Sequence, residues 1–169
     1  MAESSLEPQW LDADQQQAWR HYLHASRLLE AMMDRALQVH GVRLMEYEIL
    51  AALSESPDRR LRMSAIADWV AQSRSRLTHT AGRLEKRGWV RREACVGDRR
   101  GVELVLTDAG LEVVVETAPT HVRSIRANLV DSLSREEFLA LGRAMGVVGR
   151  GIESNKAVDG VLTAEEQPA

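Results

Sequence analysis

Residues 62–110, RMSAIADWVAQSRSRLTHTAGRLEKRGWVRREACVGDRRGVELVLTDAG, decide how the rest of the chain is interpreted. Within them, residues 63–70 have the apolar spacing of a short helix, and Ser64 stands where a hydroxyl can cap a helix start. Residues 74–87 repeat leucine or alanine every three or four positions, which predicts a second helix. Gly88 follows it, a residue type that accepts the left-handed conformation at a helix end.

The second half of this stretch predicts a β-hairpin. Residues 89–95 and 102–106 both look extended, and residues 96–101, VGDRRG, form a turn-prone loop between them. Two short helices followed by a hairpin with a basic tip predict a winged helix-turn-helix. We therefore expect a mainly α fold with a small β-hairpin wing. The residues predicted to form the core of this region are Leu61, Ile66, Trp69, Val90, Leu104 and Leu106.

Positive charge is concentrated in the same region. Between Arg59 and Gly101, twelve arginines and lysines stand against four acids, a net charge of +8. The whole chain carries −3, so the remainder carries −11. Phosphates would be attracted to this one region. The isoelectric point of the whole chain, near 6.0, conceals this local positive charge.

The bulk composition narrows the class of protein. A chain of 169 residues is long enough for one domain with its own core. It has no apolar run of membrane-spanning length and no signal-peptide pattern, so we expect no membrane partner. Cys95 is the single cysteine, which excludes an intrachain disulfide and fits a reducing compartment. We expect a cytoplasmic protein, associated with the nucleoid when bound to DNA.

Four further helices are predicted around the winged segment, because apolar side chains recur there at helical spacing. Their ranges are 14–39, 43–53, 108–129 and 135–150. Gly41 is placed to end the first of these helices, and Pro119 is placed to bend the third. The last begins with the capping box Ser134-Arg135-Glu136-Glu137.

These elements divide the chain into four parts. Residues 1–13 form a polar arm, and residues 153–169 are short on apolar side chains and predicted to be disordered. The winged helix-turn-helix takes residues 43–107. The helices within residues 14–42 and 108–152 carry more apolar surface than this small region can cover. That surplus predicts either a larger monomeric core or, as we favour, dimerisation with a second copy.

Two segments resemble the MarR family of bacterial transcriptional regulators. Residues 98–110, DRRGVELVLTDAG, are similar to the family's wing signature, in which an Asp-x-Arg tip precedes a strand ending in Leu-Thr and then a glycine. Residues 73–88, SRSRLTHTAGRLEKRG, are similar to its recognition helix. The resemblance covers about residues 15–150 and implies a homodimer that binds a pseudo-palindromic DNA operator, usually as a repressor. It also implies a cleft between the dimerisation and DNA-binding regions, where many members hold small aromatic or anionic effectors.

A recognition helix at residues 74–87 would place the face opposite its leucines in the major groove. Arg74 and Arg76 are predicted to read bases, since an arginine can donate two parallel hydrogen bonds to guanine. Phosphate contact is the alternative for each. The other residues predicted to contact DNA from this helix and its surroundings are Ser64, Ser73, Ser75, Thr78, His79 and Arg83. For the serines Ser64 and Ser73, helix capping is compatible with a phosphate contact.

The hairpin tip has a separate predicted role. Arg100 matches the family arginine that enters the minor groove, where a narrow groove concentrates negative potential. Arg99 is predicted to contact a phosphate. Asp98 is predicted to pair with Arg100 or another wing arginine and so to fix the tip. A solvated turn is the alternative.

The effector cleft is predicted to lie among the first, second and fifth helices. The candidates for holding an aromatic acid are Trp19, His21, Tyr22, Arg27 and Tyr47. For Trp19 and Tyr22, ordinary packing at the dimer interface is the alternative. No particular effector follows from the sequence.

Three other functions stay open at this point. Cys95, near the arginines of the hairpin, could be a redox-sensing thiol, although the resemblance would place such a cysteine in the first helix. A winged helix can bind protein instead of DNA, but such a module needs neither an arginine-rich helix nor a basic wing tip. An enzyme is not predicted, because the sequence has no phosphate-cradling glycine loop and its five histidines are scattered. No cofactor or metal is expected.

Overall fold

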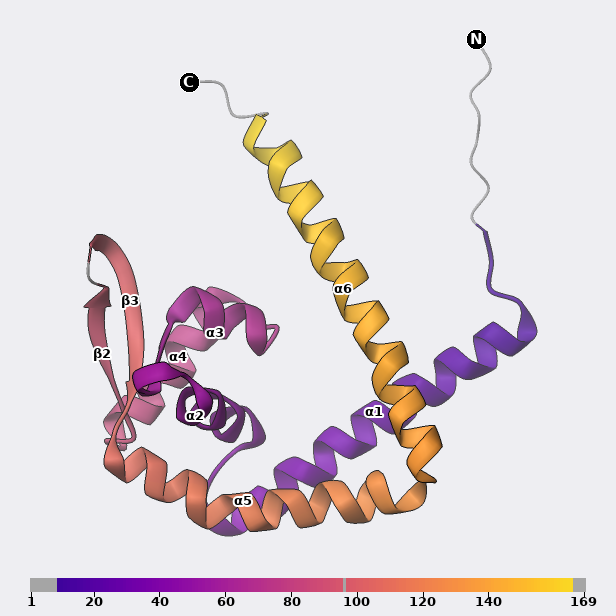
Figure 1. Ribbon diagram of the computed structural model, residues 1–169, viewed down its shortest axis with the longest axis horizontal. Coiled ribbons are helices and arrows are strands. Elements are labelled where there is room, and N and C mark those ends of the chain that lie inside the picture. The colour runs from indigo at the N-terminus through magenta and orange to yellow at the C-terminus, as the bar shows by residue number, and fades with distance from the viewer. Residues whose placement is uncertain (1–8, 96, 166–169) are drawn as a thin grey trace. The chain divides into compact units, whose positions relative to one another are not determined.

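The chain folds into helices and one small three-stranded sheet (Figure 1). The computed structural model describes residues 9–95 and 97–165, and side chains are described for residues 9–95, 97–98 and 101–155. The elements are α1 Ala13–Leu37, η1 Gln38–His40, α2 Leu44–Glu55, η2 Pro57–Arg59, β1 Arg60–Arg62, α3 Met63–Trp69, α4 Arg74–Lys86, β2 Val90–Cys95, β3 Asp98–Leu106, α5 Asp108–Asn128, η3 Val130–Ser132 and α6 Arg135–Glu165. This is the predicted mainly α fold with a small β wing.

Two compact units divide the chain near the end of α5. The first runs to Ile125 and holds the winged helix-turn-helix together with α1 and most of α5. The second starts at Arg126 and holds the last residues of α5, the 3₁₀ helix η3 and α6. All the predicted DNA-binding and effector residues therefore belong to the first unit.

α1 begins at a capping box that we did not predict. The Asp12 carboxylate accepts a hydrogen bond from the Gln15 N–H at 2.8 Å, and the Gln15 side chain accepts one from the Asp12 N–H at 3.1 Å. At the other end, η1 continues the helix as far as Gly41. The φ of +66° at Gly41 confirms the predicted stop, since glycine adopts this conformation without strain.

The sheet has three strands where a two-stranded hairpin was predicted. β3 lies between β1 and β2, and both pair with it antiparallel. β1 is only three residues long, too short for an alternating pattern to reveal it. It is defined by its pairing with β3, where Leu61 lies opposite Leu104. Because β1 leads directly into α3, the helix-turn-helix is joined to the wing through one sheet.

The predicted loop at residues 96–101 is shorter in the structure. β3 already begins at Asp98, opposite Cys95, and the strand register shifts next to this pair. Gly97 has a φ of +82°, which allows the chain to reverse close to the end of β2. Residue 96 lies outside the described residues.

The core lies where α2 and the helix-turn-helix pack against the sheet. Its fully buried aliphatic side chains are Leu37, Ile49, Leu50, Leu53, Ile66, Leu77, Leu84 and Leu104. The predicted core is confirmed at Ile66, Val90, Leu104 and Leu106, which are buried, and at Leu61, which packs against them. The prediction for Trp69 is wrong, because its side chain is 73% exposed. α3 ends at Trp69, so this last side chain extends past the edge of the core.

α5 begins where the strand β3 ends. The Thr107 hydroxyl accepts a hydrogen bond from the Gly110 N–H at 3.0 Å, which caps the first turn. Pro119 lies inside the helix, and the residues from Asp108 to Asn128 form one element.

α6 is longer than predicted. Its start confirms the predicted capping box, since the Ser134 N–H donates to Glu137 at 2.8 Å and the Glu137 N–H donates to Ser134 at 3.2 Å. The helix then continues to Glu165, past the predicted end at residue 150, and the disorder of residues 153–169 stays a prediction. Residues 1–8 and 166–169 lie outside the described residues.

Candidate nucleic-acid interface

α4 presents its predicted polar face to solvent. The core-facing side chains of Leu77, Ala81 and Leu84 are fully buried. The exposed residues on the opposite face are Arg74, Ser75, Arg76, Thr78 and His79. The Ser73 hydroxyl caps the helix by accepting a hydrogen bond from the Arg76 N–H at 3.3 Å. The first half of α4 is therefore a capped, arginine-bearing helix end that is open to a ligand.

The basic residues of this region differ in whether the chain neutralises them. Those that form ion pairs are Arg59, Arg60, Arg62, Arg83, Arg87, Arg91 and Arg92. Among the described side chains between Arg59 and Gly101, the bases without an ion pair or hydrogen bond are Arg74, Arg76 and Lys86. The two arginines predicted to read bases are thus unpaired.

Arg83 and Arg87 share a buried acidic partner. Arg83 Nε donates to Glu46 Oε1 at 3.1 Å, and Glu46, on α2, is only 4% exposed. Arg87 Nη1 lies 3.8 Å from the other carboxylate oxygen and donates to the Gly41 carbonyl at 2.8 Å. The Arg87 guanidinium also lies over the Trp89 ring, 3.5 Å from its centroid. Glu46, which we did not single out from the sequence, joins the end of α4 to α2.

Arg92 connects the wing to α4, a role that we did not predict. From β2, its Nη2 donates to the Thr78 carbonyl at 3.0 Å, and its Nη1 lies 3.4 Å from the Glu85 carboxylate. Glu85 also accepts a hydrogen bond from the Arg92 N–H at 3.2 Å. These contacts hold β2 against the middle of the recognition helix.

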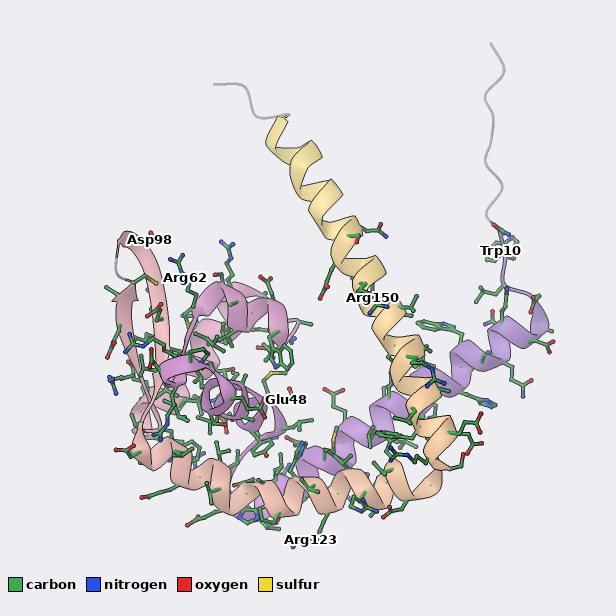
Figure 2. All side chains as sticks on the ribbon, viewed as in Figure 1. Trp10, Glu48, Arg62, Asp98, Arg123 and Arg150 are labelled. Carbon is green, nitrogen blue, oxygen red and sulfur yellow. The ribbon has the colours of Figure 1, made fainter. Side chains whose placement is uncertain are left out.

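The wing tip is tied to β1. Asp98 accepts a hydrogen bond from Arg62 Nη1 at 3.2 Å, and Figure 2 shows these two residues near one another beside the wing. The structure thus identifies Arg62 as one arginine that orders the Asp98 carboxylate. The side chains of Arg99 and Arg100 lie outside the described residues, so their contacts with DNA stay predictions.

A groove of about 490 Å³ opens between the start of α4 and the sheet. Its lining includes the guanidinium groups of Arg62, Arg74 and Arg92 and the hydroxyl-bearing Ser64 and Thr78. The predicted cap at Ser64 is wrong, because α3 begins one residue earlier and has no side-chain cap. The Asp98 carboxylate, bonded by Arg62, also lines the groove, and the Thr78 hydroxyl donates to the Arg74 carbonyl at 2.8 Å. Three arginines against one acid leave the groove positively charged, which suits a DNA phosphate.

Among the cavities found in the described part of the chain, none brings the five predicted effector residues together. Trp19 and Tyr22 stack on α1 with ring centroids 5.7 Å apart, and they are 48% and 47% exposed. His21, next to them, is also exposed. Arg27 lines one cleft and Tyr47 lines a separate cavity. The rings of Trp19 and Tyr22 lie more than one turn of α1 away from Arg27, which explains the separation.

The cleft that Arg27 lines has a volume of about 990 Å³ and lies between α1, α2 and α4. Its arginines are Arg27, Arg43, Arg76, Arg83 and Arg87. Among the described contacts, Arg27 and Arg76 have no ion pair, whereas Arg43 lies 3.5 Å from Asp34. His79 also lines the cleft. An anion bound there would lie beside three residues of α4 that are also predicted to contact DNA, Arg76, His79 and Arg83.

Cys95 is 7% exposed at the end of β2. A thiol that senses an oxidant needs solvent access, so its burial argues against the redox alternative. In the part of the chain that the structure describes, no three histidine, cysteine or acidic side chains are grouped to hold a metal ion. Within the same residues, no helix combines the length and apolar character that crossing a bilayer requires.

Known proteins are similar to this chain over the winged helix-turn-helix and its neighbouring helices. A sequence model described as the MarR family matches residues 40–101. The HTH-type transcriptional regulator PecS of Dickeya dadantii is 30% identical over 132 residues, which cover 78% of this chain and 79% of PecS. The transcriptional repressor MprA of Escherichia coli is 32% identical over 94 residues, which cover 56% of this chain and 53% of MprA.

A solved structure extends the match beyond the winged segment. Sco3205, a MarR family transcriptional regulator from Streptomyces coelicolor crystallised in complex with DNA, is 47% identical to this chain. The TM-score is 0.82, and the alignment covers 87% of this chain and 92% of that one. The similarity therefore includes helices on both sides of the winged segment.

Proposed function

This chain belongs to the MarR family of transcriptional regulators, and we propose that it binds a pseudo-palindromic DNA operator as a homodimer and represses transcription. The observation that carries this proposal is the first half of α4, where exposed Arg74 and Arg76 have no partner within the described part of the chain. In the proposed complex this half enters the major groove, and each arginine donates two hydrogen bonds to a guanine.

The remaining contacts of the proposed complex position the protein on the DNA. Ser64, Ser73 and Thr78 bond phosphates through their hydroxyls, and Ser75 and His79 contact the groove beside them. Arg100 enters the minor groove from the wing while Arg99 contacts a phosphate. Arg83 keeps its structural partner Glu46 in this proposal and contributes charge rather than base recognition.

We attribute dimerisation to the terminal helices, because large apolar side chains lie on their surfaces. The exposed ones are Trp19, Tyr22, Leu28 and Met32 on α1, Val115 and Val122 on α5, and Leu139, Leu141, Met145, Val147, Val148 and Ile152 on α6. Scattered single apolar residues need no partner, but this many on helices at both ends of one chain favours burial against a second copy. The dimer would set the two recognition helices about one DNA turn, roughly 34 Å, apart.

The proposed effector of this regulator is a small anion in the cleft lined by Arg27. The supporting observation is that Arg76 and His79 lie in the lining of that cleft. An anion held there competes for the side chains that the operator needs, so its binding and DNA binding oppose one another. The proposal assigns the protein no catalytic step and no cofactor, and it places the working protein in the cytoplasm at the nucleoid.

Footprinting of the DNA around the protein's own gene, repeated at several salt concentrations, tests the DNA-binding proposal. The expected result is a protected inverted repeat whose affinity falls steeply with salt, because phosphate contacts release counterions. Sedimentation of the free protein gives the oligomeric state in parallel. A monomer at micromolar concentration, or weak binding that ignores sequence at every site tried, would contradict the proposed operator complex.

A further inference from the structure

A second cavity, of about 430 Å³, lies where α2, α3 and α5 meet, within the first unit. It shares no lining residue with the arginine-lined cleft. The side chains that give it chemical character are Tyr47, Glu48, Glu55, Trp69 and His121. Its volume lies in the range that holds small molecules.

The charged residues of this lining are both acidic, Glu48 from the middle of α2 and Glu55 from its end (Figure 2 labels Glu48). Neither has an ion pair or a hydrogen bond among the described residues. Burial and the negative charge of Glu30 raise the pKa of Glu48. Burial and the charge of Glu55 raise the pKa of Tyr47. With two carboxylates and no arginine or lysine in its lining, the cavity has a negative potential that no ion pair among the described residues neutralises.

Aromatic rings form the rest of the wall. Trp69 lines the cavity although it is 73% exposed to solvent. The rings of Tyr47 and His121 lie against each other with centroids 4.5 Å apart. Burial lowers the pKa of His121, so its ring is neutral near neutral pH and adds no opposing charge. The electron-rich faces of tryptophan and tyrosine attract cations, most strongly where water is excluded.

Tyr47 adds a polar group to the wall of this cavity. The residue is only 7% exposed, yet its hydroxyl makes no hydrogen bond among the described residues. The hydroxyl is not one of the atoms sealed from solvent, and this cavity is the open space that Tyr47 lines. A ligand in the cavity could donate the missing hydrogen bond.

We propose that this cavity binds an organic ammonium cation, with the charged head between Glu48 and Glu55 and the apolar body against Trp69 and Tyr47. A neutral apolar ligand would leave both carboxylates unpaired, and an anion would be repelled by them. The site goes beyond the proposed operator binding and the anionic effector, because it takes a ligand of the opposite charge in a different cavity. Binding to the free protein requires no DNA, so its test is independent of the proposed function.

Titration calorimetry of the full chain with benzylammonium chloride, without DNA, tests the proposal. Benzyl alcohol and sodium benzoate serve as the neutral and anionic probes of similar size. The expected result is saturable binding of the cation and no saturable binding of benzoate. Glu48→Gln, which keeps the side-chain shape, should weaken cation binding by about tenfold or more, since one of two neutralising charges is lost. Trp69→Leu, at an exposed position, should weaken it as well.

The matched control is Glu112→Gln, which removes an exposed carboxylate of α5 that does not line the cavity. It should leave cation binding unchanged. Circular dichroism confirms that each variant is folded, and Trp69→Leu decides the question should Glu48→Gln fail to fold. Absence of saturable cation binding at millimolar concentration would overturn the proposal. Equal binding by wild type and Glu48→Gln, or binding of benzoate as tight as that of the cation, would overturn it too.

Discussion

The two halves of α4 carry the same residue type in opposite circumstances. In the first half, Arg74 and Arg76 are exposed and unpaired among the described residues. In the second half and at the residue that caps its end, Arg83 and Arg87 both reach the buried carboxylate of Glu46. The difference shows that basic charge on a recognition helix does not by itself identify a DNA contact. An acid supplied by another element decides which arginines hold the fold together and which can bond a ligand.

Removing an arginine from the second half should have the largest effect on stability. Arg87→Ala removes the ion pair with Glu46, the hydrogen bond to the Gly41 carbonyl and the contact with the Trp89 ring. We expect the free energy of unfolding to fall by about 2–4 kcal/mol, between the values for exposed and buried ion pairs. Urea unfolding measures it. Lys86→Ala, one position away and unpaired, is the control and should change it by less than about 0.5 kcal/mol; equal stability of the two variants would contradict the structural role of Arg87.

Removing an arginine from the first half of α4 should instead weaken operator binding and leave the stability of the protein unchanged. Arg74→Ala and Arg76→Ala should each weaken operator binding by roughly 1–3 kcal/mol, the value of one bidentate pair with a base. Stability should stay within about 0.5 kcal/mol of wild type, because neither side chain has a partner to lose. Competition binding with the operator and with unrelated DNA separates two outcomes. A loss confined to the operator supports base recognition, whereas an equal loss on all sequences assigns the residue to phosphate.

Arg92 sharpens the comparison, because it is paired and yet lies at the proposed DNA surface. Arg92→Lys keeps the charge but cannot reach both the Thr78 carbonyl and the Glu85 carboxylate with the same planar group. We expect operator affinity to fall by about 1–1.5 kcal/mol, the net value of a hydrogen bond that positions the wing. Arg92→Gln should lose a similar amount. Recovery of full affinity by the lysine variant would mean that Arg92 acts as a charge near phosphate instead of a link between wing and helix.

The features of this site that depend on residues close together in the sequence were predictable, and the features that depend on residues far apart in the sequence were not. Helical spacing within residues 74–87 was enough to separate the buried Leu77 and Leu84 from the exposed Arg74 and Arg76. The caps at Gly41 and Ser134 were also predictable, because capping involves only neighbouring residues.

Contacts between residues far apart in the chain were not predictable. Arg83 and Glu46 are separated by 37 positions, and no local pattern links them. β1 exists only through its pairing with β3, and the exposure of Trp69 depends on where the core ends. The five predicted effector residues were grouped by helix alone, whereas four of them lie on more than one turn of α1 and Tyr47 lies on α2, which places them in different surroundings. The family resemblance supplied the function, but it could not sort the paired arginines from the unpaired ones.

The contrast between a paired and an unpaired charged side chain also exists on α2, between the acids Glu46 and Glu48. Glu46 is buried with arginine partners, while Glu48 is partly buried and has no partner among the described residues. Burial and the charge of Glu30 raise the pKa of Glu48 above its ordinary value of 4.5. A carboxyl group with a raised folded-state pKa stabilises the fold below its unfolded pKa, and that contribution is lost as the pH rises through the folded pKa. Near neutral pH, the ionised Glu48 carboxylate therefore lowers the free energy of unfolding slightly.

Glu48→Gln should accordingly raise the free energy of unfolding near neutral pH, by less than about 1 kcal/mol. The gain should shrink as the pH falls below the ordinary glutamate pKa, because the wild-type carboxyl group is then neutral as well. Urea unfolding at about pH 7 and about pH 4 measures the difference. Glu46→Gln is the opposite control and should destabilise the protein at neutral pH, since it weakens the pairs with Arg83 and Arg87. Equal destabilisation by Glu48→Gln at both pH values would show that Glu48 already has a stabilising contact, and the cation site would then lose its unpaired charge.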